Sequence, residues 1–175
     1  MGEVHPPSPV LLLIAATSRY EDALELGREQ CEARFGATSA VSPAFDFAET
    51  SYYAAEMGDA LKKQFWAFDE IDPGRLAAIK LQTNMWESEY AALRRHPEPR
   101  PLNLDPGYIT LAKLVLASTK DHAHRIYLRD GIYAEVTLSY RRGGWQPFEW
   151  TYPDYRRPDF QRFFSRCREL LRPRA

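Results

Sequence analysis

The Asp130-Gly131 pair constrains the fold more than any other feature, because it lies between two segments that alternate apolar and polar residues. Asp-Gly is a strong signal for the tight turn of a β-hairpin. A two-residue loop would mix apolar and charged side chains on each face, whereas a three-residue loop, 129–131, sorts them onto separate faces. We therefore predict the three-residue loop, with Gly131 in the left-handed conformation of a bulge. The apolar face then holds Ile126, Leu128, Ile132, Ala134, Val136 and Leu138.

The polar face of this hairpin is the candidate functional surface. The chosen register places Arg125 opposite Glu135 and Tyr127 opposite Tyr133. One interpretation is structural, since a cross-strand ion pair contributes about 0.2–1 kcal/mol. The other is a ligand platform, in which Arg125 holds an anion, Tyr127 stacks and Glu135 acts as a base. A pocket over this face would favour the ligand platform, and bare solvent would favour the structural ion pair.

Helix and strand signals alternate along the rest of the chain. The apolar run 10–16 is typical of a strand buried on both faces. Ser18 and Glu21 have the spacing of a capping box, which predicts a helix start, and Asp72-Pro73 predicts another. The expected strands are 10–16, 45–47, 64–68, 102–105, the two hairpin segments and 145–150, and the expected helices are 18–36, 49–58, 72–93, 111–118 and 158–171.

Two of these assignments flank a turn signal. Asp105-Pro106-Gly107 is typical of a turn, which would end the strand that starts at Leu102. Periodicity alone leaves 111–118 open between helix and strand. We favour a helix, because four of its residues share one helical face: Leu111, Leu114, Val115 and Ser118.

The element order predicts an α+β fold, with a mixed, mainly antiparallel sheet and helices packed on one face. The first six elements resemble a ferredoxin-like unit, and a C-terminal hairpin or meander and a terminal helix follow. A chain of 175 residues is long enough for one domain with a substantial core. We expect residues 1–9 to form a flexible tail and residues 10–175 a single globular domain.

Charge and cysteine content narrow the function classes. The formal net charge is −1, from 23 basic and 24 acidic residues, so nothing global indicates DNA or an anionic membrane as partner. The apolar stretch 11–16 is far too short to span a bilayer. The two cysteines, Cys31 and Cys167, suggest neither a zinc site nor a disulfide framework, which fits a reducing cytoplasm. Arginines are concentrated in 156–174 and predict a local basic surface there.

Motifs for common chemistries are missing from the sequence. It contains no Gly-x-x-x-x-Gly-Lys-Ser/Thr phosphate loop, no Gly-x-Gly-x-x-Gly and no Gly-x-Ser-x-Gly. His122 and His124 would share a face of a strand and could bind a metal, but a third ligand would have to come from elsewhere, such as Asp105 or Glu135. We therefore predict no metal site and identify no cofactor.

Several long motifs carry a resemblance to a known family. They lie at 103–110, 113–121, 124–128 and 130–138, with shorter ones at 45–47, 56–58, 83–84 and 150–155. On these motifs the chain resembles one bacterial family, the domain-of-unknown-function family 4416, over almost its whole length after residue 9. The resemblance implies a free-standing cytoplasmic domain with no established activity, and an aromatic residue in relatives at the position of His122. Some members carry a GTP-binding label, but the phosphate loop that this label needs is missing here.

Our first hypothesis is a small-molecule-binding domain, and the sequence leaves open whether it is an enzyme. The site would lie where 103–108 meets 120–125 and the polar hairpin face, and the ligand would be anionic, a phosphorylated small molecule or a nucleotide. The candidate ligand-binding residues are Asn103, Asp105, Tyr108, Lys120, Arg125 and Tyr127. The candidate catalytic residues, which would move protons, are Glu135 and His124.

The alternative hypothesis is a non-enzymatic module that binds a protein or RNA. It would use the aromatic segment 145–155 and the arginine-rich final helix. Exposed Trp145, Trp150 and Tyr155 beside Arg156 would favour it, whereas burial of these rings would make them core residues. The sequence does not indicate an oligomeric state.

Overall fold

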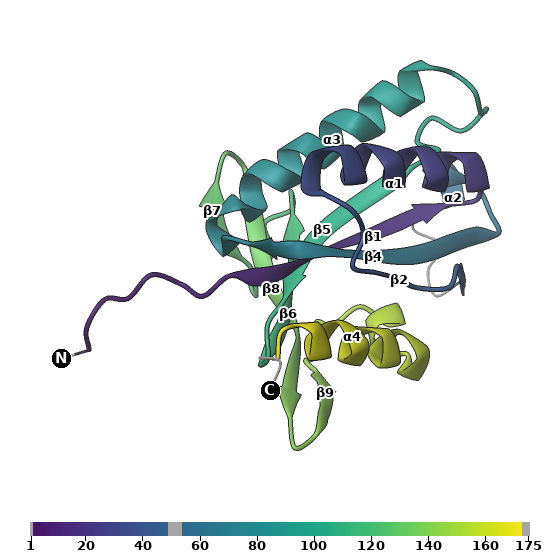
Figure 1. Cartoon of the computed structure of the whole chain (residues 1–175). Coiled ribbons are helices and arrows are strands. Elements are labelled where there is room, and N and C mark those ends of the chain that lie inside the picture. Colours follow the sequence, from purple (N-terminus) through teal and green to yellow (C-terminus); the bar gives the residue numbers. More distant parts are fainter. Residues whose placement is uncertain (1, 49–53, 173–175) are drawn as a thin grey trace.

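The computed structural model describes residues 2–48 and 54–172, which form one antiparallel sheet with helices on both faces (Figure 1). The strands are β1 (Val10–Ser18), β2 (Ala40–Val41), β3 (Phe45–Phe47), β4 (Leu61–Ile71), β5 (Asn103–Ile109), β6 (Lys113–Ser118), β7 (Ile126–Arg129), β8 (Ile132–Arg141) and β9 (Gly144–Pro147). The helices are α1 (Glu21–Phe35), α2 (Ala54–Met57), α3 (Leu76–Ala92) and α4 (Pro158–Leu170), with 3₁₀ turns η1 (Pro73–Arg75) and η2 (Asp154–Arg156). Residues 2–9 are exposed and contain no helix or strand.

The strand order confirms both the α+β class and the ferredoxin-like start. The sheet runs β2-β4-β1-β5-β6-β8-β7, with β3 paired to β4 and β9 paired to β8, and all of these pairs are antiparallel. Its first part, β2-β4-β1-β5 with α1 and α3 as the two crossover helices, is the arrangement of a ferredoxin-like unit. β6, β8, β7 and β9 extend this unit as a meander.

β1 lies between β4 and β5 and is buried on both faces, as its continuous apolar sequence predicts. Leu12 and Ile14 pack into a core beneath α1 and α3, whereas Leu11 and Leu13 pack into a second core against α4. The second core is aromatic, and the ring of Phe65 contacts those of Phe45, Tyr155, Phe160, Phe163 and Phe164. Alternation along one strand thus supplies both cores.

The expectation that all helices share one face of the sheet is wrong. α1 and α3 cover one face, and α4 lies on the opposite face (Figure 1). The physical reason is the double burial of β1: a sheet whose central strands are apolar on both sides needs a cover on each side. The apolar stripe of α4 supplies that second cover with Phe160, Phe163, Phe164 and Cys167.

The turn predicted at Asp105-Pro106-Gly107 does not form, because β5 runs straight through these residues to Ile109. Pro106 lies opposite Ile14 of β1, one residue before the stretch in which β5 pairs with β6. Proline lacks an N–H and is tolerated in a strand that is unpaired on one side. The helix favoured for 111–118 is also wrong, since 113–118 forms β6 between β5 and β8.

The hairpin register is confirmed at Ile126 and Tyr127, but not at the turn, where Arg129 rather than Leu128 pairs with Ile132. Asp130 and Gly131 both have positive φ, 53° and 75°, so the turn has two residues rather than three. The extra residue is Leu128, which lies in a bulge of β7 between Tyr127 and Arg129. Beyond the bulge the pairs are those predicted: Ile126 with Ala134, and Tyr127 with Tyr133. The apolar face is only partly buried, because β7 is the edge strand and Ile126 is 73% exposed.

The predicted helix starts differ in outcome. Asp72 accepts a hydrogen bond from the Gly74 N–H at 2.7 Å, as a cap should, and η1 leads into α3. The capping box at Ser18 is wrong, because Ser18 ends β1 and its hydroxyl donates to the Pro101 carbonyl at 2.6 Å. Of the helix expected at 49–58, residues 54–57 form α2, and 49–53 lie outside the described residues.

Candidate functional site

The candidate site lies where β5 and β6 separate. β5 pairs with β1 along its whole length, but with β6 only from Gly107 to Ile109. A Cβ atom on Gly107 would lie 2.3 Å from the Val115 carbonyl oxygen, so glycine is needed where the two strands approach. At Leu104, side chains of α3 bind the backbone groups that a neighbouring strand would otherwise pair. Lys80 Nζ donates to the Leu104 carbonyl at 3.1 Å, and Glu87 Oε1 accepts from the Leu104 N–H at 2.7 Å.

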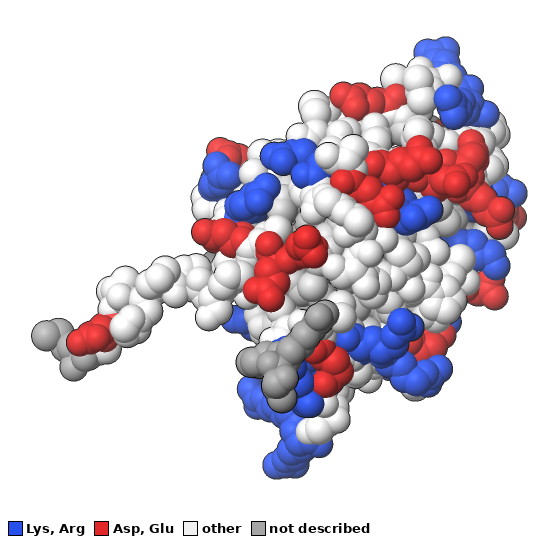
Figure 2. All heavy atoms as spheres, viewed as in Figure 1, with Lys and Arg blue, Asp and Glu red and all other residues white. Residues whose placement is uncertain are grey.

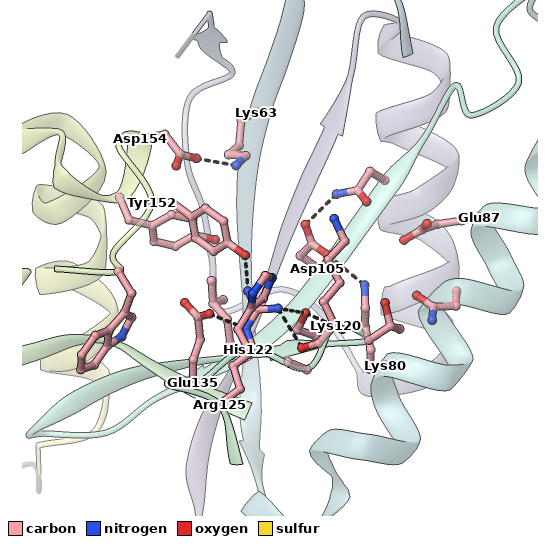
Figure 3. A pocket seen from close by; sticks show the side chains of 18 of the residues that line it. Lys63, Lys80, Glu87, Asp105, Lys120, His122, Arg125, Glu135, Tyr152 and Asp154 are labelled. Atoms are coloured by element: carbon pink, nitrogen blue, oxygen red, sulfur yellow. Dashed lines mark hydrogen bonds and ion pairs between the residues drawn. The ribbon is translucent and has the colours of Figure 1, made fainter. Parts of the chain in front are cut away.

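This separation opens into a cavity of about 810 Å³ (Figure 3). Its walls come from β4, α3, β5, the end of β6, the loop 119–125, β8 and the segment 150–155. The charged side chains that line it are Glu56, Lys63, Lys80, Glu87, Arg100, Asp105, Lys120, Arg125, Glu135 and Asp154, with His122 and His124 beside them. A cavity of this volume is within the range of small-molecule sites.

Asp105 is held ionised on the cavity wall. Its Oδ1 accepts from Lys80 Nζ at 2.9 Å, and its Oδ2 accepts from the Asn103 amide at 2.7 Å. Burial alone would raise the pKa of Asp105, but attraction to Lys80 and the hydrogen bonds from Lys80 and Asn103 outweigh it and hold the pKa at about 2. The carboxylate therefore accepts hydrogen bonds at any physiological pH.

Glu87 and Arg100 continue this network. Arg100 Nη2 donates to Glu87 Oε2 at 2.9 Å and also to the Asn103 side-chain oxygen. Burial raises the pKa of Glu87, and attraction to Lys80 and Arg100 opposes that rise. Five polar side chains thus form one chain of contacts along the α3 side of the cavity: Lys80, Asp105, Asn103, Arg100 and Glu87.

The opposite wall holds a second buried ion pair. Lys63 Nζ of β4 lies 2.5 Å from Asp154 Oδ2 of η2, and both side chains are less than a tenth exposed. The same ammonium lies 4.1 Å from the ring centre of Phe47 and 5.4 Å from that of Tyr155. Two aromatic faces and one carboxylate therefore stabilise the Lys63 charge away from water.

Arg125 and Glu135 form the ion pair predicted from the hairpin. Arg125 Nε donates to Glu135 Oε2 at 2.8 Å, and both side chains are almost fully buried. The guanidinium also donates to the Ser118 hydroxyl at 2.6 Å, the Lys120 carbonyl at 3.0 Å and the Tyr152 hydroxyl at 2.6 Å. Arg125 thus fixes the loop after β6 against β8 and directs Tyr152 toward the cavity (Figure 3).

The cavity brings together six of the eight site residues predicted from the sequence: Asn103, Asp105, Lys120, His124, Arg125 and Glu135. Tyr108 and Tyr127 lie outside it. Tyr108 packs beside two of the cores, and Tyr127 is exposed on β7 against Tyr133. Among the described residues, no three His, Cys, Asp or Glu side chains converge in a way that could hold a metal ion.

Sequence reasoning missed the cavity residues of α3, β4 and 152–154. Lys80, Asn84 and Glu87 recur at gaps of four and three, which puts them on one polar stripe of a helix whose other side is apolar. That stripe is a readable signal. No comparable pattern in the sequence marks Lys63, Tyr152 and Asp154. Their contact depends on how the segment 152–154 folds back over β4.

The fold and the cavity define an α+β domain with a ferredoxin-like start and a charged cavity where its sheet divides. The chain belongs to the family described as a domain of unknown function (DUF4416), whose model matches residues 8–171. No curated protein and no solved structure matches the chain. Within residues 2–48 and 54–172, no helix is long and apolar enough to cross a membrane.

Proposed function

We propose that this domain binds a small anionic molecule, a phosphorylated metabolite or a nucleotide, in the cavity between α3 and β8. One observation carries the proposal: three buried or largely buried ion pairs, Lys63–Asp154, Lys80–Asp105 and Arg125–Glu135, line the same cavity of about 810 Å³. They come from parts of the chain that are far apart in sequence, and no single turn or helix end explains their meeting.

Stability alone is a poor reason for such an arrangement. Charges removed from water lose hydration that their mutual attraction barely recovers, and apolar side chains of similar volume often serve a fold as well or better. Convergent charged groups in a concave site are typical of ligand binding and catalysis. The buried ion pairs are therefore better explained by ligand binding than by a contribution to stability.

The balance of charge in the lining indicates the kind of ligand. Among the described residues of the lining, five are basic (Lys63, Lys80, Arg100, Lys120 and Arg125) and five are acidic (Glu56, Glu87, Asp105, Glu135 and Asp154). With neutral histidines, their formal charges sum to zero. Lysine and arginine suit a phosphate, whereas carboxylates accept hydrogen bonds from hydroxyl groups. A phosphorylated molecule that also carries sugar hydroxyls would satisfy both sets.

An enzymatic role would fall to Glu135 and His124. His124 Nε2 lies 3.2 Å from Glu135 Oε2, within reach for proton transfer or for fixing the imidazole tautomer. The Thr137 hydroxyl donates to the other Glu135 oxygen at 3.0 Å, so the carboxylate is held from both sides. We propose these two residues as the proton-transfer pair if the bound ligand is also a substrate.

Thermal unfolding against a panel of sugar phosphates, nucleotides and divalent metals tests the proposal. A ligand at a hundred times its dissociation constant adds about 2.7 kcal/mol, which raises the midpoint by several degrees for a domain of this size. Lys120→Ala, in the cavity loop, should abolish the rise, and Lys113→Ala, an exposed side chain at the start of β6, should preserve it. A panel without a rise, or a rise that Lys120→Ala leaves unchanged, would overturn the proposal.

We further propose a location in the bacterial cytoplasm. Cys31 and Cys167 are both free and buried, one in each core, and burial raises the pKa of each thiol to about 12. Free structural cysteines of this kind suit a reducing compartment.

The alternative, a protein- or RNA-binding module, has less support. Trp145 and Tyr155, two of the three rings it would expose, are core residues packed against α4. Arg156 donates to the backbone carbonyls of Phe148, Glu149 and Thr151 and so stabilises its own loop. Figure 2 shows acidic side chains among the basic ones over much of the visible face, with basic side chains gathered at the β8–β9 end. Binding of an RNA oligonucleotide that Arg141→Ala with Arg142→Ala abolishes would revive this alternative.

A further inference from the structure

Four planar side chains form a continuous stack at the side of the cavity. The ring centroids of His122 and His124 are 5.8 Å apart, those of His124 and Trp150 5.2 Å, and those of Trp150 and Phe148 4.8 Å. The angles between the ring planes of these three pairs are 3°, 8° and 1°. Ring centres at these separations with nearly parallel planes are in offset stacking. We call these four residues the ring stack.

The two inner members of the ring stack are held by partners on β8. Trp150 Nε1 donates to the Val136 carbonyl at 3.0 Å, and His124 Nε2 lies 3.2 Å from Glu135 Oε2. Glu135 is in turn held by Arg125 and Thr137. The orientation of the stack is therefore set by β8 and does not depend on a ligand.

The ring stack ends at His122, inside the site. His122, His124 and Trp150 line the cavity, and His122 is exposed to it. Figure 3 shows His122 between Glu135 on one side and Lys80 and Lys120 on the other. His124 stacks on one face of its ring. Among residues 2–48 and 54–172 no other ring stacks on the opposite face, which can therefore receive a further planar ring.

From this geometry we infer that the ligand is a nucleotide whose base stacks on His122 as the fifth ring. The inference rests on the proposed function and narrows it, since sugar phosphates without a base would leave the end of the ring stack uncovered. Its phosphate would be held by the lysines across the cavity, and its ribose hydroxyls would face the carboxylates. Stacking accepts any base, because every base has a planar face.

Titration calorimetry can separate the base from the rest of the ligand. The four ribonucleoside monophosphates and ribose 5-phosphate are titrated into the wild-type protein and three variants, His122→Ala, His122→Phe and His5→Ala. His5, exposed in the N-terminal tail, is the matched control for loss of an imidazole. His122→Phe keeps a planar ring at the end of the stack and loses the ring nitrogens.

We expect at least one nucleoside monophosphate to bind the wild type about tenfold or more tightly than ribose 5-phosphate, which is the scale of base–aromatic stacking. His122→Ala should remove most of that difference and leave ribose 5-phosphate binding unchanged, while His122→Phe and His5→Ala should keep it. The near-ultraviolet absorbance of the base should also fall on binding to the wild type, as stacking requires.

Four results would overturn the inference. Equal affinity for nucleotide and ribose 5-phosphate would mean that the base contributes nothing. If His122→Ala lowers the affinity for the nucleotide and for ribose 5-phosphate equally, His122 only shapes the cavity. If ribose 5-phosphate or another sugar phosphate binds and no nucleotide does, the inference fails and the proposed function stands; if no phosphorylated ligand binds, both fail.

Discussion

Lys80 and Glu87, seven positions apart on α3, bind the two backbone groups of one residue of β5, the carbonyl and the N–H of Leu104. A helix thereby satisfies a strand edge that a neighbouring strand would otherwise pair. The sheet can divide at this point without leaving buried backbone groups unpaired, and the cavity exists because it divides.

This relationship predicts the effect of removing Glu87. We expect Glu87→Ala to lower the free energy of unfolding by about 2–3 kcal/mol, because the buried Leu104 N–H and the Arg100 guanidinium lose their acceptor. Glu87→Gln should cost less, since its amide oxygen can still accept from Leu104. Urea denaturation measures both, and Glu89→Ala, exposed on the same helix, is the control. Equal losses in Glu87→Ala and Glu87→Gln would contradict the backbone role.

Asp105 predicts a pH dependence of stability. Its folded pKa of about 2 lies below the unfolded value of about 3.9. A depressed carboxyl pKa stabilises the fold fully above the unfolded pKa, and that stability is lost as the pH falls toward the folded pKa. We expect Asp105→Asn to be less stable than the wild type at pH 7 by about 2 kcal/mol, with the gap closing between about pH 4 and pH 2. Urea midpoints across this range test it, with the exposed Asp121→Asn as control; a gap that stays constant would refute the linkage.

The Lys63–Asp154 pair predicts strong coupling between its members. Asp154→Leu alone should lower the free energy of unfolding by about 3–5 kcal/mol, because it leaves the buried ammonium without its carboxylate. The double variant Lys63→Met with Asp154→Leu should recover most of that loss, since both charges are then gone. A double-mutant cycle in urea measures the coupling. Lys62→Ala, the control, removes an exposed side chain that pairs with Asp46 and should change the free energy of unfolding little. If the loss in the double variant equals the sum of the losses in Lys63→Met and Asp154→Leu alone, the pair does not act as a unit.

Gly107 predicts a backbone limit on the site. Gly107→Ala brings a Cβ atom into the Val115 carbonyl oxygen, which is backbone and cannot rotate away. We expect a loss of about 3 kcal/mol or more in the free energy of unfolding, the scale of an unrelieved overpacked contact. Gly144→Ala, in β9, is the matched control, because its Cβ atom would meet only the Gln146 side-chain nitrogen at an ordinary contact distance of 3.8 Å. Equal thermal midpoints for the two variants would disprove the close approach of β5 and β6.

The sequence predicts the parts of the site that depend on local alternation. Side chains on successive strand positions point to opposite faces, so the pairing of Arg125 with Glu135 follows from the hairpin alone. The bulge at Leu128 did not disturb it, because the bulge lies between that pair and the turn. The double burial of β1 was readable for the same reason.

The remaining features depend on tertiary placement. Asp105-Pro106-Gly107 is a turn sequence by composition, but β1 pairs with all three residues and holds them extended. Lys80 and Glu87 become site residues only when α3 lies along the unpaired edge of β5. Lys63 and Asp154 are 91 positions apart, and nothing local to either residue encodes their contact.

The bulge at Leu128 also has a consequence for solubility. β7 is the last strand of the sheet, and it displays Ile126, Tyr127 and Leu128 to solvent. An open edge with apolar side chains is a template on which another chain can add a strand. The extra residue breaks the regular spacing of N–H and C=O groups along that edge, so a straight incoming strand cannot follow it for more than a few residues. The bulge in the hairpin therefore also hinders aggregation of the protein through its β7 edge.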